Sequence, residues 1–290
     1  MREAIFYVQF IKIKKMKKII MFFLAALLFV ACTGNGNKTA RVENSNIELD
    51  SISDSLRLKV ENNTVDVDVK VVYPTNNESI KKDLMELVKL TGQGDDFDGY
   101  ADSVKIDTTD MKSLVEYLLK SKAEWVKINI EGLPDDTPAY YTFELSVMDE
   151  TDNFITMAVI EDEMAGSPHP FRNVYGITYV KANGKKIGTS DLESSKTDDL
   201  KKELESKVKT YFTELTKGDD VNIDEILLKE NDEQIDYPVN GIYLLSDSVV
   251  FAYQTDEIAP YAFGMPDIKM SLKYMKDKGW LGKTLSDIVK

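Results

Sequence analysis

Alternating apolar and polar positions dominate the first half of the chain and predict strands. Residues 56–60 read LRLKV and residues 65–71 read VDVDVKV, with a short asparagine turn between them. This period of two predicts an antiparallel hairpin with one face in solvent. Two aromatic-rich runs, residues 139–148 and 154–161, predict a second pair of neighbouring strands.

Two helices are predicted between these strand pairs. Apolar residues recur at helical spacing in residues 78–90 and again in residues 109–122, which gives each segment one apolar stripe. The order strand, strand, helix, helix, strand, strand predicts an α+β domain over residues 47–160.

A second group of elements follows. Residues 197–215 are predicted to form a long amphipathic helix, with one apolar stripe made of Leu200, Leu204, Val208, Tyr211 and Leu215. Three strands are predicted, over residues 173–180, 240–245 and 249–254. We therefore expect a second α+β domain over residues 161–276 and a C-terminal tail over 277–290. The fold class is expected to be α+β, with two sub-domains that are each an antiparallel sheet covered by one or two helices.

A basic stretch and an uninterrupted apolar run occupy the N-terminus. Residues 12–18 read KIKKMKK, and residues 19–31 are thirteen apolar or small residues without a charge. Such a run is shorter than the roughly 20 residues that span a bilayer as a helix, and it suits the core of a signal peptide. The only cysteine, Cys32, follows Ala31, and this junction resembles a bacterial lipobox. We expect residues 1–31 to be a lipoprotein signal peptide and Cys32 to carry lipid; the alternative is a short membrane anchor with an incidental cysteine.

The segment after the cysteine indicates where the protein resides. Residues 32–46 are polar and rich in Gly, Asn and Thr, which is typical of a flexible tether. No acidic residue precedes Glu43 in this segment. We therefore expect a lipid-anchored protein of the cell envelope, at the outer membrane and facing the periplasm, and not a cytoplasmic one.

Charge narrows the classes of partner. The chain has 36 Lys and Arg against 50 Asp and Glu, and residues 1–31 hold six of the basic residues but only one acid. The remaining chain therefore carries 30 basic and 49 acidic residues, a net charge of -19. This surface repels phosphate backbones, so we expect no nucleic acid partner, and it favours a cationic one. One cysteine excludes an intramolecular disulfide, and one histidine excludes a multi-histidine zinc site.

An acidic stretch between the first two helices has part of the pattern of a calcium loop. Asp96, Asp98 and Gly99 fit the third, fifth and sixth positions of an EF-hand loop. Gly94 and Lys105 occupy its first and last positions, where acidic ligands are needed. We therefore expect an exposed acidic loop, and neither a metal nor a cofactor.

Two proline-containing loops hold the candidate partner-binding residues. Ser167 and Pro168 precede His169, which a second proline follows, so the backbone around the imidazole is restricted. Pro260 and Tyr261 form a turn after the last predicted strand, where a stiff phenol could anchor a partner. The alternatives are structural: His169 could make one hydrogen bond within the fold, and Tyr261 could pack to hold the turn.

No arrangement of residues predicts catalysis. Asp256 and Glu257 are adjacent, so on a strand they would point to opposite faces and could not act as an acid and base pair. The sequence contains no nucleophile elbow and no zinc-binding set. We therefore expect no catalytic residue and no enzyme activity.

Several short motifs together resemble a known family. They occur in a fixed order: Gly166 to His169, Asn183-Gly184-Lys185, Ser190-Asp191-Leu192, the long amphipathic helix, and EIAPYAFG at residues 257–264. This set resembles the domain-of-unknown-function 3298 family, the C-terminal part of RsiV-like proteins. The segment before it resembles the partner domain that usually precedes this family.

The resemblance implies a binding role. RsiV-like proteins bind lysozyme through their outer region, and related domains accompany a peptidoglycan deacetylase whose catalysis belongs to another domain. We expect a membrane-anchored, non-catalytic binder of lysozyme or of another cell-wall-related partner such as peptidoglycan. The alternative is a hydrolase or accessory domain that acts on an envelope polymer through carboxylates near the loops 165–171 and 256–264.

Overall fold

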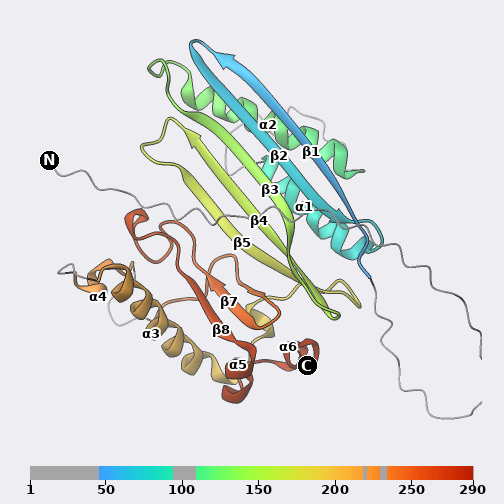
Figure 1. Ribbon diagram of the computed structural model, residues 1–290, viewed down its shortest axis with the longest axis vertical. Helices are drawn as coiled ribbons and strands as arrows, with labels where there is room; N and C mark the ends of the chain where they lie inside the picture. The colour runs from blue at the N-terminus through green and yellow to red at the C-terminus, as the bar shows by residue number, and fades with distance from the viewer. Residues whose placement is uncertain (1–45, 94–108, 218–220, 229–233, 290) are drawn as a thin grey trace, which may run out of the picture. The chain divides into compact units, whose positions relative to one another are not determined.

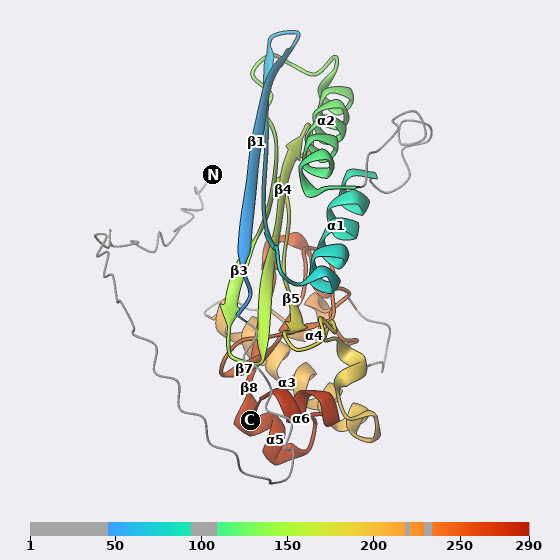
Figure 2. The ribbon, with the colours of Figure 1, turned by 90° about the vertical axis from the view of Figure 1, so that its right-hand side faces the viewer.

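Five strands form the larger sheet of this computed structural model, which describes residues 46–93, 109–217, 221–228 and 234–289 (Figure 1). All of these residues belong to one compact unit, Val42–Lys290. The strands follow one another across the sheet in chain order: β1 (Leu49–Val60), β2 (Asn63–Pro74), β3 (Ala139–Glu150), β4 (Phe154–Ala165) and β5 (Phe171–Val180). Two helices, α1 (Glu78–Gln93) and α2 (Met111–Ile130), cover one face of the sheet (Figure 2).

The predicted hairpin is confirmed as β1 and β2, and both strands are longer than predicted. Val65, Val67, Val69 and Val71 of β2 are buried against the helices, while the positions between them face the other side. Burial of alternate valines is what this sequence period requires. The turn occupies residues 61–62, one position earlier than expected.

The prediction of an antiparallel sheet is wrong for this part of the chain, because the sheet is mixed. β2 pairs with β3 in parallel, from Asp66 opposite Tyr140 to Val71 opposite Leu145. The helices α1 and α2 form the crossover between these strands and return the chain to the end at which β2 began. A parallel neighbour requires such a long connection, whereas a hairpin does not.

The larger sheet extends beyond the boundary expected at residue 160. β4 continues to Ala165, and β5 pairs antiparallel with β4. Residues 173–180, expected in the second domain, therefore belong to the first sheet. The connection from 166 to 170 is short enough for the chain to reverse directly onto its neighbouring strand, which keeps β5 in the same sheet.

The smaller sheet is antiparallel, as predicted, and it consists of β6 (Ile242–Leu244), β7 (Ser248–Ala252) and β8 (Asp267–Ser271). The predicted helix is confirmed at the same residues as α3 (Thr197–Leu215), which buries Leu200, Leu204 and Val208 in the core beside this sheet. The predicted stripe is wrong at its end, where Phe212 is buried and Leu215 is exposed. Sequence analysis missed β8. Short helical segments complete the unit: η2 (Thr189–Asp191), η3 (Ser194–Lys196), α4 (Ile223–Ile226), η4 (Tyr261–Phe263), α5 (Leu272–Lys278) and α6 (Lys283–Ile288).

The C-terminal residues are part of the core. Met275, Trp280 and Leu285 are buried in the same hydrophobic cluster as α3. The backbone N–H of Glu193 donates to the carbonyl of Trp280 at 2.9 Å. The segment 277–290 was expected to be a tail, but its described residues, 277–289, close the smaller core.

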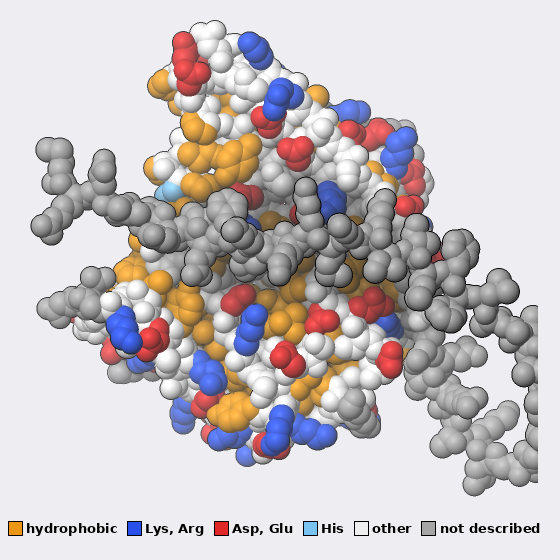
Figure 3. All heavy atoms as spheres, viewed as in Figure 1, with side chains coloured by type: hydrophobic (Ala, Val, Ile, Leu, Met, Phe, Trp, Pro, Cys, Tyr) orange, Lys and Arg blue, Asp and Glu red, His pale blue; other side chains and the backbone are white. Residues whose placement is uncertain are grey.

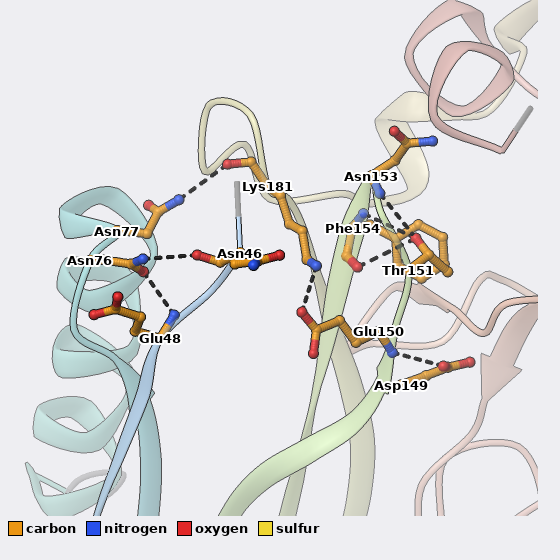
Figure 4. A network of polar contacts seen from close by, with 10 residues as sticks. All are labelled: Asn46, Glu48, Asn76, Asn77, Asp149, Glu150, Thr151, Asn153, Phe154 and Lys181. Atoms are coloured by element: carbon orange, nitrogen blue, oxygen red, sulfur yellow. Dashed lines mark hydrogen bonds and ion pairs between the residues drawn. The ribbon is translucent and has the colours of Figure 1, made fainter. Parts of the chain in front are cut away.

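Polar contacts join the ends of several strands (Figure 4). The buried Lys181 ammonium lies 2.5 Å from a carboxylate oxygen of Glu150. Asn77 donates to the Lys181 carbonyl at 3.2 Å, and Asn153 donates to the Ile288 carbonyl at 2.9 Å. These bonds connect α1, the β4 hairpin and the C-terminus, so they fix how the strand ends meet.

Candidate functional site

The loop after β4 and the loop after β7 meet at one pair of aromatic rings. The imidazole of His169 stacks on the phenol of Tyr261, with ring centroids 3.8 Å apart and planes inclined by 18°. Tyr261 is 37% exposed, and His169 is half-buried beneath it. The two loops are therefore neighbours in space, although His169 and Tyr261 are more than ninety positions apart in the chain.

The first loop is shaped by its own backbone contacts. Gly166 has a φ of +76°, and a Cβ there would lie 2.4 Å from Leu133 Cδ1, so glycine suits both the turn and the close approach. The Ser167 hydroxyl donates to the His169 carbonyl at 2.7 Å. Ser167 and Pro168 are exposed. In the part of the chain that the structure describes, no hydrogen bond or ring contact joins either residue to the second loop.

Two carboxylates hold the second loop. Asp256 has a φ of +58°, and its side chain accepts a hydrogen bond from the Tyr261 backbone N–H at 2.6 Å. Glu257 accepts from the backbone N–H groups of Val239 at 2.6 Å and Gln254 at 2.7 Å. Burial raises the pKa of Glu257 above its usual value. Both carboxylates thus bind backbone groups that set the turn at Tyr261.

The side chain of Gln254 ties this second loop to the larger sheet. Its Oε1 accepts from the Val174 backbone N–H at 2.8 Å, and its Nε2 donates to the Val174 carbonyl at 3.1 Å. The amide therefore pairs with the outer edge of β5 as a neighbouring strand would. Thr255 adds a bond from its hydroxyl to the Arg172 carbonyl at 3.0 Å.

Polar side chains of the sheet lie close to the aromatic pair. Asp162 accepts a hydrogen bond from the Tyr140 hydroxyl at 2.9 Å and from Arg172 at 3.4 Å. Burial, with the bond to Asp162 next in importance, raises the pKa of Tyr140 to about 12, and the Tyr261 phenol adds a small contribution of the same sign. Tyr140 is therefore neutral at physiological pH and acts as a donor.

The neighbouring acids of β4 point to the opposite face. Glu161 accepts from the Tyr141 hydroxyl at 2.7 Å and lies 3.2 Å from the Lys122 ammonium. Burial raises the pKa of Glu163. Successive residues of a strand alternate between faces, so these two acids do not join Asp162 in one acidic site.

The predicted residues are thus partly brought together. His169 and Tyr261 form the pair, Pro260 is exposed directly before it, and Ser167 shapes the first loop. Sequence reasoning missed Tyr140, Asp162, Arg172 and Gln254. No local signal marks them, because their pairing depends on strand register. Their role, and that of the pair, in binding a partner stays a prediction.

Other motif residues hold the fold. The Lys185 ammonium pairs with the buried carboxylate of Asp191 and donates to the Thr284 hydroxyl at 3.2 Å. The Gly282 backbone N–H donates to the Asp191 carbonyl at 3.0 Å. Lys185 and Asp191 therefore fasten the C-terminal segment to the turn after β5.

Several expectations lie outside the described residues: the signal peptide at 1–31, the lipidation of Cys32, the tether up to residue 45, and the acidic loop 94–105. Within the described ranges, no three His, Cys, Asp or Glu side chains gather as a metal ion would require. None of the helices in the same ranges combines the length and the apolar character needed to cross a bilayer.

The C-terminal part of the chain matches a known family, and the fold as a whole is similar to solved structures. Residues 190–273 match the family model described as a protein of unknown function (DUF3298). A DUF3298 family protein from Pseudomonas aeruginosa PAO1 shares 11% sequence identity and a TM-score of 0.58, over 83% of this chain and 97% of that chain. A DUF3298 family member from Bacteroides fragilis NCTC 9343 shares 15% identity and a TM-score of 0.60, over 84% of this chain and 97% of that chain. No curated protein sequence matches the chain.

At these identities the solved structures show a common fold. The matched range begins after the His169 loop and includes Tyr261. The motifs from Ser190 onward thus lie inside the domain that they indicated. Residues 190–273 are therefore similar to the DUF3298 family, and the chain shares its fold with solved DUF3298 family proteins.

Proposed function

We propose that the protein is a lipid-anchored envelope protein that binds a partner, without catalysis, through the His169 and Tyr261 pair. Cys32 would carry the anchor, and residues 32–46 would tether the folded unit. The partner would be a cationic protein such as lysozyme, or a cell-wall component such as peptidoglycan. The net charge of -19 after residue 31 supports the first of these.

The observation that carries the proposal is the stacked, exposed ring pair. Tyr141, Tyr179 and Tyr243 of the sheets are buried, whereas Tyr261 is 37% exposed on a turn that two carboxylates hold. A rigid aromatic side chain can bury a large area on binding at little entropic cost. Stacking on His169 restricts the phenol further, which prepares it for contact.

The hydrogen bonds of the nearby acids support binding over catalysis. Both oxygens of Glu257 accept from backbone N–H groups, and Asp256 accepts from the Tyr261 N–H. Asp162 is occupied by Tyr140 and Arg172. A general base must reach a substrate proton, and these carboxylates already serve the local structure.

Retention on immobilised lysozyme and on peptidoglycan tests the proposal. We expect Tyr261→Ala to reduce retention at least tenfold, because loss of an aromatic anchor at an interface costs about 2 kcal/mol or more. Leu90→Ala is the matched control, since Leu90 is a 55% exposed apolar residue of α1.

A further variant separates contact from folding. Tyr261→Phe keeps the ring stack, so the single histidine should keep its ring-current-shifted proton NMR signals. Unchanged retention of folded Tyr261→Ala on both ligands would remove this residue from the site. Release of new fragments or deacetylated sugars from peptidoglycan by the wild type, lost in Asp162→Asn, would instead establish an enzyme.

A further inference from the structure

The C-terminal part of the folded unit has the opposite charge to the rest of the protein. Residues 267–289 contain five lysines and three aspartates, a net charge of +2 in a chain whose net charge is -14. These residues include β8, α5 and α6. In Figure 3, Lys and Arg side chains gather along the lower end of the molecule, where Figure 1 places α5.

Aromatic rings organise the lysines of this surface. The ammonium groups of Lys207 and Lys278 each lie 5.5 Å from the centre of the Tyr274 ring. Lys278 also lies 5.8 Å from the ring of Trp280. A cation is attracted to the face of an aromatic ring. Because Lys207 of α3 and Lys278 of α5 both lie over the Tyr274 ring, the two helices place positive charge at the same point of the surface.

A shallow hollow lies beside these rings. Its volume is about 320 Å³, and its lining is Asp199, Lys202, Glu203, Lys278 and Trp280. Glu203 accepts from the Tyr274 hydroxyl at 2.9 Å and lies 3.4 Å from Lys207, so its charge is offset. Asp199 is 4.0 Å from Lys196. Each of the two acids in the hollow therefore has a lysine partner, Lys196 or Lys207, and the positive charges of Lys202 and Lys278 remain unpaired by these acids.

The exposed lysines of α5 extend the positive surface. Lys273 is paired with Asp277 at 2.6 Å. Lys276 and Lys278 are exposed, and no carboxylate of the described chain lies within ion-pair distance of either. Two unneutralised ammonium groups beside half-buried Tyr274 resemble the basic and aromatic composition of surfaces that adsorb to anionic membranes.

We propose that this surface, formed by α5 and the facing side of α3, rests on the anionic phospholipid headgroups of the membrane. Phosphate-bearing headgroups attract this basic surface, whereas they repel the acidic remainder of the protein. The hollow between Lys202 and Lys278 is where one phosphate would bind. The inference rests on the proposed membrane anchoring, which would bring the unit to the bilayer and leave the His169 and Tyr261 pair on another part of its surface.

Vesicle binding by the unit Val42–Lys290 tests the inference without the anchor. Both large core clusters are built from residues within this unit, so it contains what it needs to fold. Cosedimentation is measured with phosphatidylglycerol vesicles and with phosphatidylcholine vesicles at low salt. We expect binding to the first only, weakening as ionic strength approaches about 0.15 M.

Two double variants give the decisive comparison. Lys276→Gln with Lys278→Gln should weaken binding about 30-fold, from about 1 kcal/mol per lysine near an anionic surface. Lys82→Gln with Lys120→Gln removes the same charge from exposed positions of α1 and α2 and should change binding little. Matching thermal unfolding curves confirm that all three proteins are folded.

Several outcomes would overturn the inference. One is the absence of binding to phosphatidylglycerol vesicles, and another is an equal loss in both double variants. Binding of inorganic polyphosphate without binding of vesicles would assign the surface to a soluble polyanion instead. Because Cys32 is absent from the tested unit, failure of this test leaves the anchoring proposal intact, and failure of lipidation leaves this test intact.

Discussion

Replacement of Gln254 by methionine tests whether one side chain positions the candidate site. Gln254 is only 5% exposed, and it makes three hydrogen bonds: two with the backbone of Val174 and one from Nε2 to the Ala252 carbonyl at 3.0 Å. Methionine has a similar length and no amide. Packing is therefore largely kept while the three bonds are lost.

The expected cost follows from the groups left behind. The Val174 N–H and C=O are half-buried on the outer edge of β5, and the Ala252 carbonyl is buried. A buried polar group without a partner costs about 1 to 3 kcal/mol, with the lower part of this range for groups that reach some water. We therefore expect Gln254→Met to lower the free energy of unfolding by about 2 to 4 kcal/mol.

Urea unfolding followed by tryptophan fluorescence measures this change. Thr255→Val is the control, because it removes one partly exposed bond to the Arg172 carbonyl and should cost about 1 kcal/mol. Because His169 is the only histidine, its proton NMR signals report the ring stack directly. In Gln254→Met these signals should move toward the positions of a free imidazole.

Two results would refute this reasoning. A loss of stability below that of Thr255→Val would mean that the amide does not act as the partner of β5. Unchanged histidine signals in a destabilised Gln254→Met would mean that the two loops meet without it. The m-value must match the wild type for the comparison to hold, since a change in m indicates a change in the unfolding transition.

Three further predictions follow. A Cβ at Gly176 would lie 2.4 Å from the ring of Tyr243, so Gly176→Ala should lower the free energy of unfolding by about 1 to 3 kcal/mol, measured by thermal or urea unfolding. Gly188→Ala is the control and should leave stability unchanged, because a Cβ at Gly188 has nothing within 4 Å. Equal effects of the two substitutions would contradict the packing of β5 on β6. Burial raises the pKa of Glu257, so the folded state binds the proton of this carboxyl more tightly than the unfolded state does. The contribution of Glu257 to the free energy of unfolding therefore falls as the pH rises above the usual pKa of a glutamate. The stability of Glu257→Gln relative to wild type should therefore improve from about pH 4.5 upward, and a flat difference would show that the carboxyl titrates alike in both states. Finally, Cys32→Ser should move the protein from the membrane to the soluble fraction, and retention on membranes after a high-salt wash would refute lipidation.

Element types were predictable wherever burial followed a simple period. The valines of β2 alternate, and the leucines of α3 recur at helical spacing, so one buried face was visible in each case. β8 was missed because its five residues carry only Ile268 and Met270 as buried positions. Such a short strand gives little periodic signal.

The direction and neighbours of strands were harder to predict. The same pattern of residues suits β3 as a parallel or an antiparallel neighbour of β2, and the crossover through α1 and α2 decides between them. Likewise, β5 carries no mark of the sheet to which it belongs. Only its pairing with β4 shows that the larger sheet continues past residue 160.

The sequence by itself determined the α+β class, the long helix α3, the DUF3298 motifs and the two loops that hold His169 and Tyr261. These features depend on residues that are near one another in the chain. Tertiary structure alone decided that the two rings stack and that Gln254 caps the edge of β5. It also decided that Lys207 and Lys278 gather around one tyrosine. Apart from the contact of Lys278 with Tyr274, these contacts join residues tens of positions apart, and they depend on strand register and helix packing, which no local pattern specifies.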